Sequence, residues 1–236
     1  MKKILTILFI ILVLVSCGGG NKQDESKANE VNVAIDETFR PIMEAEFEVF
    51  NAKQPEAIIN ASYLPETDAI NLMLKDSVRT IIATRKLSAK EEQQIFDVYK
   101  LQVQSKIIAY DAIALIINKA NNDSLLSVNE LKSIMTGNIT QWNQIQNATT
   151  KGEIEVVFDN ENSSTVRYVR DSICEGKQLK GNFKGGKTNQ DVIKYVSQTR
   201  NAIGIIGVDW LRNQADSTNL TFNPNIRVMS ISRSSV

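Results

Sequence analysis

The chain of 236 residues contains no histidine, and this absence limits the chemistry that it can perform. Without histidine there is no Ser-His-Asp or Cys-His catalytic arrangement, and zinc sites lose a common ligand. Aromatic residues make up only 6% of the sequence, which leaves few side chains on which nucleic-acid bases could stack. We therefore expect neither a histidine-dependent enzyme nor a nucleic-acid-binding protein.

The balance of charges and the number of cysteines exclude further kinds of partner and cross-link. Lys+Arg and Asp+Glu each number 27, so no excess of positive charge indicates a polyanion as partner. Only Cys174 lies well inside the chain, so we expect no intramolecular disulfide and a small, buried, hydrophobic role for this residue. No group of carboxylates has the spacing of a metal site, and we expect neither a metal nor a cofactor.

The N-terminus has the pattern of a targeting segment. Lys2 and Lys3 precede an apolar run, residues 4–15, that is too short to span a bilayer comfortably and fits a secretory signal. The run ends in Leu-Val-Ser followed by Cys17, which resembles the lipobox of bacterial lipoproteins. The alternative is a plain signal peptide with an incidental cysteine.

The lipobox resemblance implies how the N-terminus is processed and where the protein resides. Residues 1–16 would be removed as a signal peptide, and Cys17 would carry the lipid. Residues 17–30 begin with three glycines and continue with polar residues, so they would serve as a flexible tether. We expect a protein anchored to the membrane in the bacterial cell envelope and facing the periplasm.

The rest of the chain, residues 31–236, alternates short β-rich runs with helical patterns. Residues 58–63 and 154–158 are typical strands, and Ser88 with Glu91 forms a capping box at the start of a helix. Such alternation indicates an α/β fold. Residues 101–118 form a Val- and Ile-rich extended stretch, long enough to leave one sheet and enter another.

One strand, turn and helix start stands out as a candidate anion site. The strand at 154–158 leads into a polar turn, and a helical pattern follows. The first helical turn exposes unpaired N–H groups and the positive end of the helix dipole, which together suit an oxyanion. Ser163, Ser164 and Thr165 add hydroxyl donors, and Arg167 adds a full charge. The alternative is an ordinary N-cap.

Six segments resemble the phosphate-binding proteins of high-affinity phosphate ABC transporters, the PstS-like family. The most specific is 131–142, which runs from a helix through Thr-Gly and Ile-Thr to Trp142. Residues 163–165 stand where the family carries its Ser-Gly-Thr anion loop. The other segments are 38–42, 82–87 followed by Glu91, 110–118 and 202–207.

The resemblance implies a type II periplasmic-binding-protein fold, with two α/β lobes joined by crossover strands. The first lobe would comprise about 31–108 and 203–236, and the second about 109–202. The protein would be a monomer that holds inorganic phosphate in the cleft and delivers it to an ABC transporter permease. The implied phosphate contacts are Thr38 and Phe39 (mainly backbone N–H), Thr67, Thr84, Ser163, Ser164 and Thr165.

The sequence departs from the family pattern at the anion loop. The arginine that usually precedes this loop is missing, and Asp159 lies nearby, so Arg167 or Arg85 would supply the charge. Ser164 replaces the family's glycine, and Thr84 stands near the place where many members carry an aspartate that accepts the proton of hydrogen phosphate. Asp159 or Glu161 would then be the acceptor. Sulfate, molybdate or a phosphate ester remains an alternative ligand.

Two other functions compete with phosphate capture. A lipid-anchored sensor or scaffold could use the same fold, because a fold does not fix a function. An enzyme, such as a phosphatase or hydrolase using Ser164, is disfavoured because no histidine is present to activate the serine. The chain also ends soon after its last expected strand, 226–231, where relatives commonly continue. It is expected to be a shortened member or a fragment with an incompletely covered first lobe.

Overall fold

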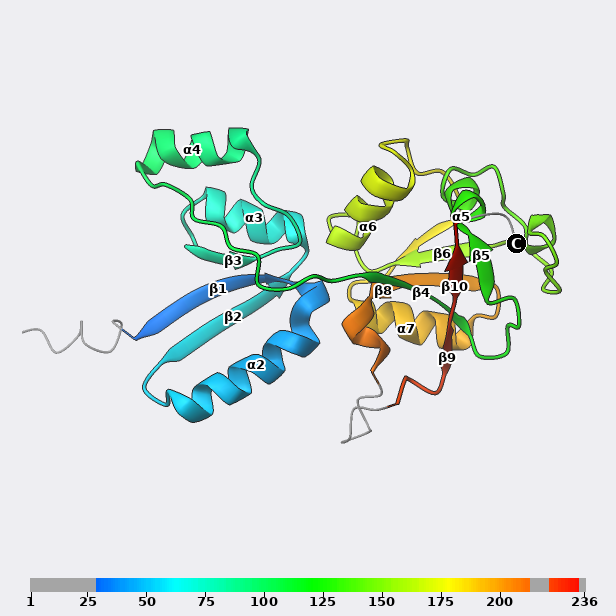
Figure 1. The fold of residues 1–236 in the computed structure, drawn as a ribbon, viewed down its shortest axis with the longest axis horizontal. Helices are drawn as coiled ribbons and strands as arrows, with labels where there is room; N and C mark the ends of the chain where they lie inside the picture. The colour runs from blue at the N-terminus through cyan, green and yellow to red at the C-terminus, as the bar shows by residue number, and fades with distance from the viewer. Residues whose placement is uncertain (1–28, 213–220, 234–236) are drawn as a thin grey trace, which may run out of the picture.

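The structure, a computed structural model, describes residues 29–212 and 221–233. The expected signal peptide, Cys17 and nearly all of the expected tether lie outside the described residues. The described residues form two α/β lobes that lie side by side and are connected by an extended segment (Figure 1). None of the described helices combines the length and apolar character needed to cross a membrane.

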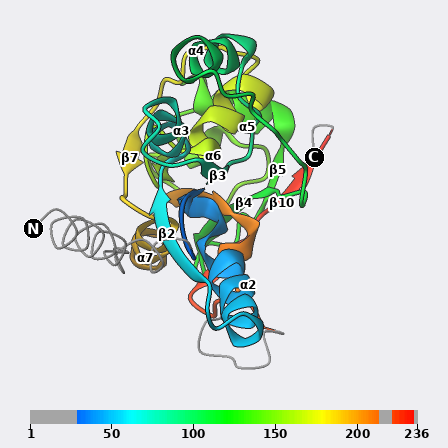
Figure 2. The same cartoon turned by 90° about the vertical axis from the view of Figure 1, so that its left-hand side faces the viewer.

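The first lobe is built on a small parallel sheet with strand order β2-β1-β3. Helix α2 lies on one side of this sheet, and α3 and α4 lie on the other (Figure 1, Figure 2). The elements are β1 (Glu30–Asp36), η1 (Glu37–Phe39), α2 (Arg40–Lys53), β2 (Ile58–Leu64), α3 (Glu66–Leu74), β3 (Thr80–Ile82) and α4 (Ala89–Tyr99).

The apolar interior of the first lobe is thin. Its fully buried hydrophobic side chains come mainly from the end of β1 and the middle of α3, and α2 contributes no buried residue. Local signals instead fix its helices: the Ser88 side chain accepts from the Glu91 backbone N–H, and Glu91 accepts in return from the Ser88 backbone N–H. This capping box confirms the expected start of α4.

The second lobe contains a five-stranded mixed sheet with strand order β7-β6-β8-β4-β9. Strand β6 runs parallel to β7 and β8, whereas β4 is antiparallel to β8 and β9. A two-stranded sheet, β10-β5, completes the strands of this lobe. The strands are β4 (Ile113–Asn118), β5 (Leu125–Ser127), β6 (Glu155–Phe158), β7 (Phe183–Gly185), β8 (Ala202–Gly207), β9 (Ile226–Val228) and β10 (Ser230–Ser232).

Two hydrophobic clusters give the second lobe its core. Trp142 is completely buried in the larger cluster, where its ring Nε1–H donates to the Asn201 carbonyl at 3.0 Å. Cys174 is also completely buried, as expected. The helices are α5 (Val128–Met135), η2 (Trp142–Gln144), α6 (Ser164–Tyr168), the π-helical η3 (Val169–Ile173), α7 (Asn189–Gln198) and η4 (Val208–Leu211).

The expected lobe boundary is wrong for the C-terminal part of the chain. We expected residues 203–236 to return to the first lobe, but β8 lies in the middle of the second lobe's sheet, between β6 and β4. Strands β9 and β10 also pair with strands of that lobe. All six residues of β8 are buried, which requires a neighbour on each edge and cover on both faces.

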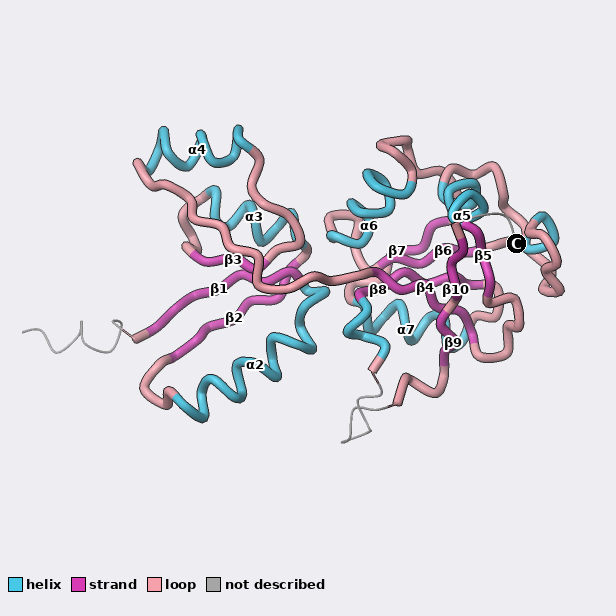
Figure 3. Tube along the Cα trace, in the orientation of Figure 1, coloured by secondary structure: helices cyan, strands magenta, loops and turns pink. Residues whose placement is uncertain are grey.

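The expected extended stretch at 101–118 is regular only at its end. Residues 113–118 form β4, whereas residues 101–112 form no strand and run between the lobes as an irregular segment (Figure 3). Ile107 and Ile108 in this segment are mostly exposed. A single extended segment between two sheets has no strand beside it with which to form a hydrogen-bonded ladder, so its β-rich composition does not produce a strand.

Packing against Gly204 makes the second lobe sensitive to a single added methyl group. A Cβ on Gly204 would lie 2.7 Å from Val196, 2.8 Å from Val192 and 2.9 Å from Ile116. We predict that Gly204→Ala lowers the free energy of unfolding by about 1–3 kcal/mol, because α7 and β4 would have to move apart. Urea denaturation measures this loss.

Gly185→Ala is the matched control because nothing lies within 4 Å of a Cβ at that position in β7. Its unfolding midpoint should stay close to that of the parent protein. Equal stability of the two variants would show that the side chains around Gly204 leave room for a methyl group.

Candidate functional site

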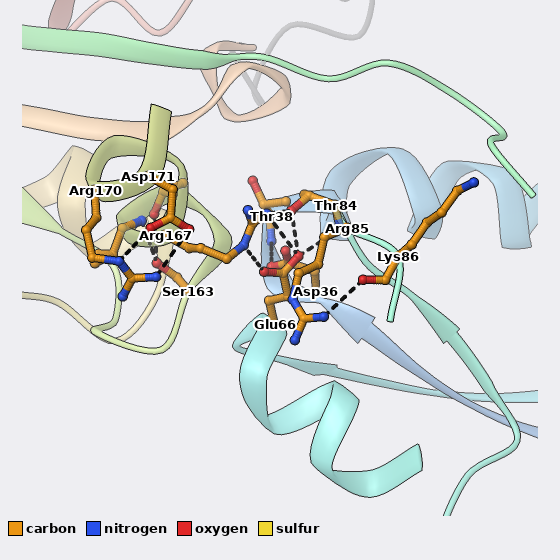
Figure 4. Close-up of polar contacts among 12 residues, drawn as sticks. Asp36, Thr38, Glu66, Thr84, Arg85, Lys86, Ser163, Arg167, Arg170 and Asp171 are labelled. Carbon is orange, nitrogen blue, oxygen red and sulfur yellow. Dashed lines mark hydrogen bonds and ion pairs between the residues drawn. The ribbon is translucent and has the colours of Figure 1, made fainter. Parts of the chain in front are cut away.

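The candidate site lies where the two lobes meet. In the first lobe, β1 ends at Asp36, α3 begins at Glu66, and Thr84 follows β3. In the second lobe, β6 ends just before Asp159, and α6 begins at Ser164. In α/β sheets ligands bind beyond the carboxyl ends of the strands, and both sheets direct those ends toward this junction. Figure 4 shows the side chains of the two lobes facing each other here.

The first group of contacts is centred on the carboxylate of Glu66, which is only 2% exposed. From the second lobe, Arg167 Nε donates to Glu66 Oε2 at 2.5 Å, and its Nη2 donates to Thr84 Oγ1 at 2.6 Å. From the first lobe, the Thr84 hydroxyl and backbone N–H donate to Glu66 Oε1 at 2.6 and 3.0 Å. Donors from both lobes therefore converge on one negatively charged group (Figure 4).

The second group is the hydroxyl-rich turn, which is organised around Asp159. Ser163 Oγ and Thr165 Oγ1 both donate to Asp159 Oδ1 at 2.7 Å. Ser163 Oγ also accepts from the Val166 backbone N–H at 3.3 Å and so caps α6. Burial raises the pKa of Asp159, and the two hydroxyl donors partly offset this rise. In this arrangement the carboxylate fixes the conformation of the turn.

Two further acids lie at the end of β1. Burial raises the pKa of Asp36 to about 7, although hydrogen bonds from the Ser164 side chain and the Thr38 backbone N–H act in the opposite direction. Burial also raises the pKa of Glu37 to about 7, and donation from Asn189 opposes the rise. Asn189 Nδ2 donates to Glu37 Oε2 at 2.6 Å across the lobe boundary. The junction therefore contains several buried acids. Near neutral pH, a fraction of the Asp36 and Glu37 carboxyl groups is protonated.

Other hydrogen bonds between the lobes involve backbone groups near the predicted contacts. The Thr67 backbone N–H donates to the Asn162 carbonyl at 3.2 Å, and Trp210 Nε1–H donates to the Thr38 carbonyl at 3.1 Å. The Thr38 backbone N–H donates to Asp36 Oδ1 at 3.2 Å. The Thr38 hydroxyl is buried and has no hydrogen-bond partner among residues 29–212 and 221–233.

The structure brings some of the sequence-predicted residues together and separates others. Thr84 and Arg167 share the Glu66 contacts, and Asp159, Ser163 and Thr165 share the turn. Ser164 is buried beside Asp36, and Phe39 is half-buried just before α2. Arg85 lies apart, because it forms a bidentate ion pair with Glu91 of its own lobe at 2.8 and 2.9 Å.

Sequence reasoning missed the acids Asp36, Glu37 and Glu66. Each of these acids stands beside a predicted phosphate contact in the sequence. Asp36 and Glu37 directly precede Thr38, and Glu66 directly precedes Thr67. An acid at a helix start is ordinarily a solvated partner of the helix dipole, so nothing in the local pattern indicates burial. Across the described part of the chain, no group of three or more acids or cysteines could hold a metal ion.

The raised pKa of Asp36 makes stability depend on pH. The folded protein binds the Asp36 proton with a pKa of about 7, against an ordinary value of 3.8, so folding is favoured at low pH. We predict that the free energy of unfolding falls as pH rises from about 4 to about 7. Asp36→Asn should reduce this slope by on the order of 1 kcal/mol for each pH unit. Urea denaturation at pH 5 and pH 7 measures it.

Asp76→Asn is the control for this experiment. Asp76 has a φ of 53°, which asparagine tolerates, and its ion pair with Arg79 lowers its pKa, so its titration falls below this pH window. The Asp76 variant should keep the parent slope between pH 5 and pH 7. A parent slope that persists in Asp36→Asn would mean that Asp36 is not protonated in the folded protein.

Comparisons with known proteins agree with this architecture. A family model described as "PBP superfamily domain" matches residues 20–235. The chain is 22% identical over 219 residues to the phosphate-binding protein PstS of Staphylococcus haemolyticus (strain JCSC1435), covering 89% of this chain and 68% of that protein. The chain thus spans about two thirds of the length of the curated relatives it matches.

Solved structures support the same fold. A putative phosphate ABC transporter substrate-binding protein with bound phosphate from Clostridium perfringens has a TM-score of 0.73 and 24% identity, over 87% of this chain and 76% of that one. An ABC-type phosphate transport receptor from Vibrio cholerae has a TM-score of 0.61 and 20% identity, over 87% and 78%. The two-lobed α/β fold that the sequence resemblance implied is confirmed.

Proposed function

Because the chain belongs to the PBP superfamily, we propose that it captures inorganic phosphate between its lobes and delivers it to an ABC transporter permease. One observation supports this most directly: Arg167 and Thr84, from opposite lobes, direct their donors at the same negatively charged group. The oxygens of phosphate accept hydrogen bonds as the oxygens of that carboxylate do. A guanidinium can form two parallel hydrogen bonds with either group. The Staphylococcus haemolyticus relative and the two solved structures are a phosphate-binding protein, a putative phosphate ABC transporter substrate-binding protein and a phosphate transport receptor.

Capture and release require the lobes to separate and close again. The hydrogen bonds from Thr67, Trp210 and Asn189 cross the lobe boundary and would break and re-form in this motion. The segment at 101–112 connects the lobes without belonging to either sheet, so it is the natural place for the backbone to absorb a hinge rotation. This arrangement suits reversible binding and not turnover.

The acids at the junction favour phosphate over sulfate. A carboxyl with a pKa of about 7, such as Asp36, is present in both forms at neutral pH. Its protonated form can donate to a phosphate oxygen, and its ionised form can accept the proton of hydrogen phosphate. Sulfate carries no proton at this pH, so it can donate no hydrogen bond to the ionised carboxylate and meets it only as a like charge. Phosphate is therefore our preferred ligand among the oxyanions.

We predict that Arg167→Met weakens phosphate binding by about 100-fold. The side chain keeps much of its apolar length but loses the charged donors, and a charge-assisted contact at a partly buried site contributes about 3 kcal/mol. Isothermal titration calorimetry of residues 28–236 with phosphate, followed by sulfate, measures the effect.

Arg170→Met is the matched control for Arg167→Met. Arg170 lies one helical turn further along and pairs with Asp171 at the surface, so its loss should leave the phosphate affinity unchanged. Equal affinity of the Arg167 variant and the parent protein would exclude Arg167 from the site. Absence of phosphate heat in the parent protein would contradict the proposed function as a whole.

We also propose that a lipid on Cys17 holds the protein at the outer face of a membrane, in the periplasm of a bacterium. The lipobox-like sequence before Cys17 and the polar residues after it support this proposal. We predict that Cys17→Ala moves the protein from the membrane fraction to the soluble fraction. Cys174→Ala, which changes the buried cysteine of the folded part, should remain with the membranes. Retention of the Cys17 variant in the membrane fraction would exclude the lipid anchor.

A further inference from the structure

Glu66 has the contacts of a bound anion. Its two carboxylate oxygens receive the Arg167 guanidinium, the Thr84 hydroxyl and the Thr84 backbone N–H, at distances from 2.5 to 3.4 Å. Its side chain is almost completely removed from solvent, whereas Arg167 remains about a quarter exposed. A charged guanidinium, a hydroxyl and an amide N–H form a common donor set for an oxyanion.

A purely structural role explains this arrangement less well. A glutamate at the first position of a helix is already stabilised by its own helix dipole, and at the surface it would need no partner from another lobe. The Arg85–Glu91 pair illustrates an ordinary ion pair, since both residues lie in the first lobe and hold one turn to one helix. The Glu66–Arg167 pair instead joins residues 101 positions apart, at the junction where the ligand is proposed to bind.

We propose that Glu66 is a tethered competitor for the captured oxyanion and thereby sets the affinity and selectivity of the site. This inference rests on the proposed function. Arg167 Nε–H, the Thr84 hydroxyl and the Thr84 backbone N–H each carry one hydrogen, and Glu66 accepts all three, so phosphate can receive these donors only when Glu66 leaves them. A phosphate bound beside the Glu66 carboxylate would also be repelled by its negative charge. Capture of phosphate by these three donors therefore requires Glu66 to leave them.

Competition of this kind also discriminates among anions. A ligand must displace a singly charged carboxylate that is already held at high local concentration by its own chain. A doubly charged, tetrahedral oxyanion gains more from Arg167 than a monovalent anion does, and it has further oxygens for the buried Ser164 hydroxyl. Glu66 would thus reject small monovalent anions and lower the affinity for phosphate to a value that permits release.

Glu66→Gln tests this inference, because glutamine keeps the shape of the side chain and removes its charge. We expect inorganic phosphate to bind at least about tenfold more tightly to the variant than to the parent protein in a calorimetric titration. We also expect acetate, as a monovalent probe, to give measurable binding heat only with the variant. Glu175→Gln is the control, since it removes an ion pair with Lys132 within the second lobe and should change neither result.

Each other outcome has a distinct meaning. Unchanged phosphate affinity in Glu66→Gln would overturn the inference and leave the ion pair a structural one. Weaker binding would also overturn it, because Glu66 would then be a ligand contact that accepts the proton of hydrogen phosphate. Phosphate binding by neither protein would contradict the proposed function itself, and the inference with it. If the parent protein binds phosphate and Glu66→Gln binds it no more tightly, only the inference about Glu66 is contradicted.

A second variant and an optical measurement cover the case in which Glu66→Gln fails to fold. Glu66→Asp keeps the charge and the helix start but shortens the side chain by one methylene, so it should also bind phosphate more tightly. Trp210 reports on the lobe boundary, because its ring donates to Thr38 and is 5% exposed. Either variant should shift the Trp210 emission to longer wavelength, and phosphate should reverse that shift. An emission spectrum identical to the parent's, together with unchanged affinity, would exclude competition.

Discussion

The ion pair between Glu66 and Arg167 is the interaction on which the junction of the two lobes depends. Each partner lies at the start or in the first turns of a short helix, and each helix is fixed to a different sheet. Removal of one partner from such a pair leaves an uncompensated charge at a site that excludes most water, which costs more than the pair itself contributes. The two lobes therefore remain together at this junction only while an anion faces Arg167. In the structure the carboxylate of Glu66 supplies that anion, and in the proposed function phosphate replaces it.

An anion site among so many carboxylates requires a physical explanation. Asp36, Glu37 and Asp159 are all buried near the junction, and burial raises the pKa of each. A protonated carboxyl is neutral and can donate a hydrogen bond, so burial reduces the repulsion that these acids would otherwise exert on a ligand. The same acids fix the surrounding backbone, since Asp159 binds the hydroxyls of its turn and Glu37 binds Asn189 across the boundary. The same side chains thus support the backbone and, when protonated, limit the negative charge that faces the ligand.

The local patterns of the sequence predict much of the fold and only part of the site. The alternation of strands and helices and the capping box at Ser88 each depend on neighbours in sequence, and both are confirmed. The lobe assignment of β8 could not be read this way, because an apolar strand does not indicate which strands will flank it. Arg167 was identifiable from its charge beside the turn and Thr84 from the family resemblance, whereas the role of Glu66 arises from the approach of a second lobe. Burial of a charge is a tertiary property, and no spacing rule along one helix encodes it.

A crystal structure of the protein grown with phosphate would test the central claim most directly. The proposed mechanism predicts a phosphate within hydrogen-bonding distance of Arg167 and Thr84, with the carboxylate of Glu66 turned away from both. A phosphate elsewhere on the molecule, with the Glu66–Arg167 ion pair intact, would contradict both the location of the site and the competition that is proposed to control it.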